Sequence, residues 1–190
     1  MGDGHAQATD GIKASIRAGI RSIEHGVYLD DEAIGMMLEN GTYLVPTLMA
    51  PRGVIVAAAA GANIADESLR KAEMVIEEHA DSVARAIAAG VKVAMGTDSG
   101  VTPHGQNLRE VGLMVDRGLT PAAALVATSR TAAELLGVDA ELGTLEPGKR
   151  ADIVMVDGDA LDVDGLGDRI VAVWKDGDQV VGDPRAVARD

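Results

Sequence analysis

The stretch "VKVAMGTDSGVTPHG", residues 91–105, decides the fold class of this chain. Five mostly apolar residues run into "GTDSG" at 96–100, and His104 follows six residues after Asp98. A short strand that is apolar on consecutive positions is typical of a parallel sheet with both faces covered. Glycines alone would indicate a turn, but here a carboxylate stands where a buried strand ends. In parallel α/β folds, functional side chains gather at that end.

The same pattern precedes this stretch, because predicted helices repeatedly end at glycine and lead into a short apolar segment. Each helix opens with Asp or Thr, which can accept hydrogen bonds from the first turn. Each closes at Gly19, Gly41 or Gly90, where a left-handed residue can end a helix. Alternating helices and buried strands predict the α/β class with a parallel sheet. The helix–strand pairs are "TDGIKASIRAG" with "IRSIEHG", "DDEAIGMMLENG" with "TYLVPT", and "DESLRKAEMVIEEHADSVARAIAAG" with "VKVAMGTD".

The pattern changes after Asp98. Helices are predicted near 107–117 and 121–136. The tail then reads "GTLEPGKRADIVMVDGD" and "RIVAVWKDGDQVVGD", which predict short antiparallel strands joined by Gly/Asp turns. We therefore predict two domains, residues 1–141 and 142–190.

Composition restricts the possible partners. Of the 190 residues, 47% are hydrophobic and 25% charged, so a packed core is expected. The net charge of −13 repels phosphate backbones and anionic lipid, which disfavours nucleic-acid and membrane partners. No apolar run reaches the roughly 18–20 residues that cross a bilayer, and no signal peptide is predicted, so we expect a cytoplasmic protein. The absence of cysteine excludes disulfides and thiolate metal sites.

Three residues fall at predicted strand ends: Asp98, His25 at the end of "SIEH", and His5 before the first helix. Two imidazoles and a carboxylate can bind a catalytic zinc and leave one position open for water. The alternatives are a turn or N-cap aspartate and histidines that merely pack or face solvent. His104, in a Pro/Gly loop, is a candidate for substrate contact. His79 lies inside the long helix and is expected to be structural, away from the cluster.

With these residues, the chain resembles the second half of a metal-dependent amidohydrolase. The nearest branch is that of the imidazolonepropionase-like and Xaa-Pro (prolidase-like) or Xaa-Arg dipeptidases. The matching stretches cover most of the chain and are "HAQATDGIKASIRAGIRSIEHG" at 5–26, "LDDEAIGMMLENGTYLVPTL" at 29–48, "GTDSGVTPHGQNLREVGLMV" at 96–115, "LTPAAALVATSRTAAELLG" at 119–137 and "LGTLEPGKRADIVMVDGD" at 142–159.

The resemblance implies a (β/α)8 TIM-type barrel beside a small β-sandwich. Residues 1–141 would be strands five to eight with their helices, and 142–190 the C-terminal strands of the sandwich. His5 and His25 would be metal ligands ending strands five and six. Asp98 would end strand eight as metal ligand and general base, and His104 would face substrate. The implied cofactor is a divalent metal, expected to be zinc, with one or two ions in a complete site.

The departure from the family lies in what the chain lacks. The H-x-H pair of strand one and the bridging lysine of strand four have no counterpart here. A whole barrel takes about 250 residues. We therefore expect a fragment, or a chain that pairs with an N-terminal half or with itself, and that holds metal poorly alone. The inward apolar residues of "VKVAM" and "YLVPTL" should then face water.

The implied reaction is hydrolysis of an amide-type C–N bond in a dipeptide or cyclic amide. A bound metal lowers the pKa of its water toward about 7. Asp98 would take the proton of the attacking water and pass it to the leaving nitrogen. Two alternatives stay open: a half-barrel that assembles without catalysis, and a metal-free isomerase that uses Asp98 and His104.

Overall fold

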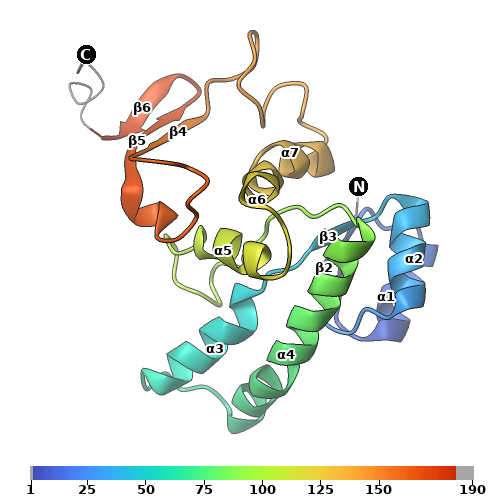
Figure 1. Ribbon diagram of the computed structural model, residues 1–190. Helices are drawn as coiled ribbons and strands as arrows, with labels where there is room; N and C mark the ends of the chain where they lie inside the picture. The colour runs from blue at the N-terminus through green and yellow to red at the C-terminus, as the bar shows by residue number, and fades with distance from the viewer. Residues whose placement is uncertain (1, 183–190) are drawn as a thin grey trace.

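Parallel strands and helices alternate through the first part of the chain (Figure 1). The structure is a computed structural model and describes residues 2–182. The elements of the first part are β1 (Asp3–Ala6), α1 (Thr9–Arg17), β2 (Ser22–His25), α2 (Asp31–Asn40), β3 (Tyr43–Val45), α3 (Met49–Ala59) and α4 (Asp66–Ala89). Those of the second part are α5 (Arg109–Asp116), α6 (Pro121–Thr128), α7 (Arg130–Leu136), β4 (Ile153–Val156), the 3-10 helix η1 (Leu166–Arg169), β5 (Ile170–Lys175) and β6 (Asp178–Val181).

The first sheet is parallel, in the order β1-β2-β3, and the predicted α/β class is confirmed. A fourth segment continues it beside β3. The Leu44 N–H donates to the Lys92 carbonyl at 2.8 Å, and the Ala94 N–H donates to the Leu44 carbonyl at 3.0 Å. The predicted strand at 91–95 therefore adds to the sheet, although it forms only an isolated parallel bridge between Leu44 and Val93.

Glycine ends the helices as predicted, but the helix starts differ from the prediction. Gly41 and Gly90 follow α2 and α4 in the left-handed conformation, with φ of 65° and 91°. At the N-termini, Asp30 caps α2 by accepting from the Ala33 N–H at 2.8 Å. In α1 and α4 the predicted capping residues, Thr9 and Asp66, are instead the first helical residues. The preference of Asp and Thr for the N-cap position therefore predicted the start of each helix to within one residue.

The main core lies between the sheet and its helices. It joins Ile23 and Leu44 of the sheet to apolar residues of α1, α2, α4, α5 and α6. A smaller cluster covers the opposite face of the sheet. There Tyr43, Val45 and Ala94 pack against Ala132 and Leu135, which both belong to α7.

The expectation that the inward apolar residues face water is wrong. Tyr43 and Val45 are 7% and 6% exposed, and Ala94 is 1% exposed. The physical reason is that α7 returns across this face and buries it. A cavity of about 540 Å³ remains beside α7, and it is lined by residues of α7 and of the strand segments, among them Asp3, Ser22 and Glu24.

The predicted helix at 121–136 is divided into α6 and α7 at Ser129, whose φ of −129° and ψ of −83° are not helical. Beyond α7, β4, β5 and β6 form an antiparallel sheet in that order, as the tail sequence predicts. In Figure 1, α5, α6 and α7 stand between the two sheets. The domain boundary at 141/142 stays a prediction, and residues 183–190 of the second segment lie outside the described residues.

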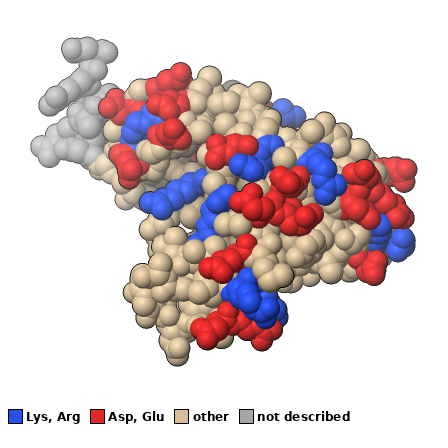
Figure 2. All heavy atoms as spheres, turned by 60° about the horizontal axis from the view of Figure 1, so that its bottom comes forward, with Lys and Arg blue, Asp and Glu red and all other residues tan. Residues whose placement is uncertain are grey.

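Charged side chains of both signs lie next to one another over the face that Figure 2 presents. Ion pairs such as Lys71–Glu67, at 2.7 Å, join neighbouring side chains of opposite charge. The net charge of −13 is therefore not gathered into one acidic patch on that face. Within residues 2–182, no helix is both long and apolar enough to span a bilayer.

Candidate active site

Two histidines meet at the C-terminal ends of neighbouring parallel strands. His5 of β1 is exposed, and His25, the last residue of β2, is 7% exposed. His5 Nδ1 lies 3.0 Å from His25 Nε2, and the two rings meet edge to face with centroids 4.4 Å apart. Burial lowers the pKa of His25, and the charge of His5 lowers it further. Both effects favour neutral imidazole, the form that can bind a metal.

The backbone at the end of β2 is bent sharply. His25 has a φ of 68°, a left-handed conformation that is uncommon for a residue with a side chain. Gly26 follows with a φ of 66°, and a Cβ added there would lie 2.8 Å from Leu44 Cδ1. The turn therefore needs glycine at 26, and it carries the His25 ring out of the regular strand geometry.

Thr47, two residues after the end of β3, fixes the orientation of the His25 ring. Its Oγ1 lies 2.6 Å from His25 Nδ1 and donates to the Pro46 carbonyl at 2.7 Å. A hydroxyl has a single hydrogen, so Thr47 accepts from the Nδ1–H of His25. The Nε2 lone pair of His25 is then the one directed at His5. Thr47 itself has a left-handed φ of 51°, so strained backbone occurs at both strand ends.

Asp98 lies at the same end of the sheet but stands apart from the histidine pair. It is exposed, has a φ of 52°, and its negative charge raises the pKa of His25. Within residues 2–182, no group of three or more His, Asp or Glu side chains is close enough to hold a metal ion. The structure therefore brings His5 and His25 together and leaves Asp98 within electrostatic range of them.

The Asp98 loop is anchored to α3. Thr102 is 3% exposed and packs against Gly53, where an added Cβ would lie 2.4 Å from Thr102 Cγ2. Before the loop, a Cβ at Gly96 would lie 2.4 Å from Val45 Cγ1. Close packing thus requires glycine at position 53 against Thr102 and at position 96 against Val45. His104 lies further along the same loop and is exposed, so its contact with substrate stays a prediction.

Comparison with known proteins identifies the family. Residues 2–181 match the Amidohydrolase family. The chain belongs to the amidohydrolase family. The family inferred from the sequence is thereby confirmed.

Relatives of this amidohydrolase chain include ochratoxinase from Aspergillus niger, which is 34% identical over 180 residues, covering 91% of the chain and 36% of the relative. A crystal structure of a Xaa-Pro dipeptidase with bound methionine is 36% identical, with a TM-score of 0.88 over 95% of the chain and 44% of the dipeptidase. A putative prolidase from Bifidobacterium longum is 34% identical, with a TM-score of 0.84 over 97% of the chain and 48% of the prolidase. The chain spans less than half the length of each.

His79 of α4 adjoins the site, and the expectation that it lies away from the cluster is wrong. It is 1% exposed, and its Nε2 lies 3.0 Å from the His25 carbonyl oxygen. Burial lowers the pKa of His79 to about 4, although hydrogen bonds to the backbone of His25 and Pro46 oppose this. The neutral His79 ring donates its Nε2–H to the His25 carbonyl oxygen. Its position between Ile76 and Val83 on the apolar stripe is the sequence signal for its burial.

Glu110 of α5 is a buried residue that the sequence reasoning missed. Its carboxylate accepts from the Leu48 N–H at 2.7 Å and from the Met49 N–H at 2.9 Å, at the start of α3. Glu110 is fully buried, and burial raises its pKa to about 7 against the opposing effect of these hydrogen bonds and of Arg52. It fixes α3 directly after Thr47. Its place beside Val111 in an apolar helix face is the signal that it points inward.

Proposed function

We propose that this chain supplies two metal ligands and a general base to an amidohydrolase that cleaves an amide-type C–N bond in a dipeptide or a cyclic amide. One observation carries the proposal: His5 Nδ1 and His25 Nε2 face each other at 3.0 Å, at the C-terminal ends of adjacent parallel strands. Membership of the amidohydrolase family and the likeness to a Xaa-Pro dipeptidase support the reaction class.

The histidine pair fits a zinc ion. Two imidazole nitrogens about 2.0–2.1 Å from a tetrahedral zinc lie about 3.3 Å apart. The observed 3.0 Å separation is close to this value. The Thr47 contact leaves the Nε2 lone pair of His25 available, and His5 is exposed. Asp98 would be the third ligand.

In the complete site, a bound metal supplies an activated water and polarises the substrate carbonyl. Asp98 accepts the proton of the attacking water at its carboxylate and returns it to the leaving nitrogen. His104, exposed on the loop after Asp98, contacts the substrate. His25 is held neutral by burial, which keeps its nitrogen available as a ligand.

The proposal includes the architecture of the whole enzyme. Strands β1, β2, β3 and the segment 92–94 would be strands five to eight of a (β/α)8 barrel within residues 1–141. The antiparallel sheet would belong to a β-sandwich within 142–190. The order of the parallel strands follows the chain order, as it would in a barrel of this kind. The partner would be an N-terminal half chain or a second copy of this chain.

A half-barrel that assembles without catalysis is the second candidate. It is favoured by the position of Asp98, which does not join the two histidines in a three-ligand group among the described residues. The two candidates differ in whether Asp98 affects turnover.

A chimera tests the proposal. Residues 2–182 would replace the matching part of the Xaa-Pro dipeptidase, and hydrolysis of Xaa-Pro dipeptides would be measured with metal content. We expect Asp98→Asn to lower kcat by about 10²–10⁴-fold, because it removes the general base. Asp139→Asn, at an exposed aspartate, is the matched control. A folded, metal-loaded chimera that hydrolyses the dipeptides equally well with Asp98→Asn would refute the assignment.

A further inference from the structure

Three side chains of α4 hydrogen-bond to the backbone that follows His25. His79 donates to the His25 carbonyl at 3.0 Å, and Ser82 donates to the Gly26 carbonyl at 2.6 Å. Arg85 donates to the Leu29 carbonyl, also at 2.6 Å. These donors are three residues apart, so they occupy neighbouring positions along one side of the helix. We call them the α4 donor row.

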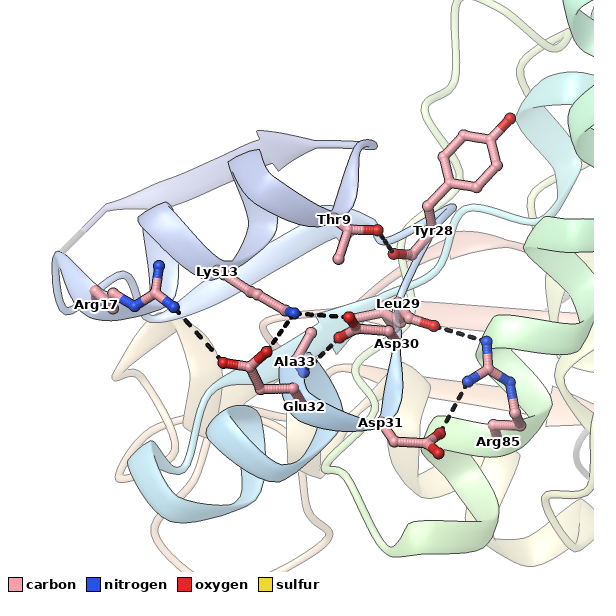
Figure 3. A network of polar contacts seen from close by, with 10 residues as sticks. All are labelled: Thr9, Lys13, Arg17, Tyr28, Leu29, Asp30, Asp31, Glu32, Ala33 and Arg85. Carbon is pink, nitrogen blue, oxygen red and sulfur yellow. Dashed lines mark hydrogen bonds and ion pairs between the residues drawn. The ribbon is translucent and has the colours of Figure 1, made fainter.

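Two members of the donor row are completely enclosed. His79 and Ser82 are 1% and 0% exposed. Arg85 is partly exposed, and Figure 3 shows its guanidinium between the Leu29 carbonyl and the carboxylate of Asp31, which it meets at 3.1 Å. The row therefore runs from the buried strand end toward the surface.

The other end of the same connection is held from α1. Thr9 donates to the Tyr28 carbonyl at 2.6 Å, and Lys13 contacts Asp30 and Glu32 at 2.6 Å each (Figure 3). The connection between β2 and α2 is thus fixed by side chains of two helices.

The donor row supplies hydrogen bonds to carbonyl groups in the left-handed turn. His25 and Gly26 have φ values of 68° and 66°, so the chain leaves the regular strand at the point where the site residue stands. Buried carbonyl groups that leave a sheet need other hydrogen-bond partners. His79 and Ser82 provide them for the two residues of this turn.

We propose that the α4 donor row, chiefly His79 and Ser82, positions His25. By holding the carbonyls of the His25–Gly26 turn, it fixes the left-handed backbone and thereby keeps the His25 ring against Thr47 with Nε2 directed at His5. His79 and Ser82 are positioning residues, since they act through the backbone of His25 and Gly26. The metal readout below rests on the proposed function, whereas the backbone readout does not.

The test uses the full chain with two measurements: the zinc dissociation constant by calorimetric titration, and hydrogen exchange of the Gly26 amide, which bonds to the carbonyls of Ala6 and Glu24. Loss of a contact that orients a metal-binding histidine typically lowers affinity about 10–100-fold. We expect His79→Leu and Ser82→Ala to weaken zinc binding about 10-fold or more and to speed Gly26 exchange. His79→Gln, which retains a side-chain N–H donor, should restore most of both.

Two controls on the same helix separate positioning from general stability. Val83→Ala removes core volume beside the row and should lower Tm while changing the zinc dissociation constant less than about twofold, because it leaves the donors in place. Ser68→Ala alters an exposed serine and should change neither measurement.

The proposal is overturned if His79→Leu and Ser82→Ala leave both the Gly26 amide exchange rate and the zinc dissociation constant as they are in the unaltered chain. It is also overturned if Val83→Ala weakens zinc binding as much as these two replacements do. If His79→Leu does not fold, the same two measurements on Ser82→Ala, compared with those on Ser68→Ala, decide the question. If the unaltered chain binds no zinc, the proposed metal centre fails, and Gly26 exchange alone decides the role of the donor row.

Discussion

Replacing Glu110 by alanine is expected to destabilise the fold substantially, because two buried N–H groups lose their acceptor. Leaving a buried donor without a partner costs about 1–3 kcal/mol, so the Leu48 and Met49 N–H groups together give about 2–6 kcal/mol. We therefore expect the free energy of unfolding to fall by about 4 kcal/mol. The matched control is Glu67→Ala on α4, which removes only an exposed ion pair with Lys71 and should change the free energy of unfolding far less.

Glu110 also predicts how stability changes with pH. Its pKa is about 7 in the folded chain and 4.5 without burial, so the folded state binds more protons between these values. This contribution is fully present below pH 4.5 and is lost as pH rises through 7. A difference of about 2.5 pKa units corresponds to about 3 kcal/mol. Relative to Glu110→Gln, the unaltered chain should therefore lose about 3 kcal/mol of stability between pH 4.5 and pH 8.

Urea unfolding followed by circular dichroism, repeated across that pH range, measures both effects. The reasoning is refuted if Glu110→Ala costs no more than Glu67→Ala. It is equally refuted if the stability difference between the unaltered chain and Glu110→Gln is the same at pH 4.5 and pH 8.

Three further predictions concern the strand ends and the sheet edges. Nitrogen NMR shifts of the His25 ring should report a mixture of tautomers in Thr47→Val and the Nδ1–H tautomer alone in Thr47→Ser. Identical spectra for the two variants would contradict the hydrogen bond between Thr47 and His25. Gly96→Ala should destabilise the fold by about 1–3 kcal/mol, because its Cβ would lie 2.4 Å from Val45 Cγ1. Gly112→Ala, which has open space around its Cβ, should not destabilise the fold, and thermal melting of both variants measures the difference. Light scattering should find the chain in complexes larger than one copy, and a monodisperse monomer with hydrolase activity would count against the half-barrel.

The sequence predicted the features that depend on local pattern. Glycine spacing located the C-terminal ends of α2 and α4, and the short apolar segments located the parallel strands. His5 and His25 were placed at strand ends, and parallel strands bring such ends together, so their contact could be expected.

Features that depend on distant packing were not predictable in this way. His79 and Glu110 bond to backbone groups 54 and about 62 residues away, and sequence alone does not say which carbonyl or N–H a buried polar side chain will meet. The return of α7 over the inner face follows from the break at Ser129, which an otherwise helical pattern conceals. The left-handed φ of His25 likewise has no local signal, because glycine occupies the next position rather than this one.

Zinc titration of the chain with single histidine replacements tests the central claim most directly. We predict that the unaltered chain saturates weakly at one ion, and that His5→Ala and His25→Ala each abolish this binding. His104→Ala, at an exposed histidine of the neighbouring loop, should leave it unchanged. Zinc binding that persists undiminished in His25→Ala, or two tightly held ions per chain, would contradict the account.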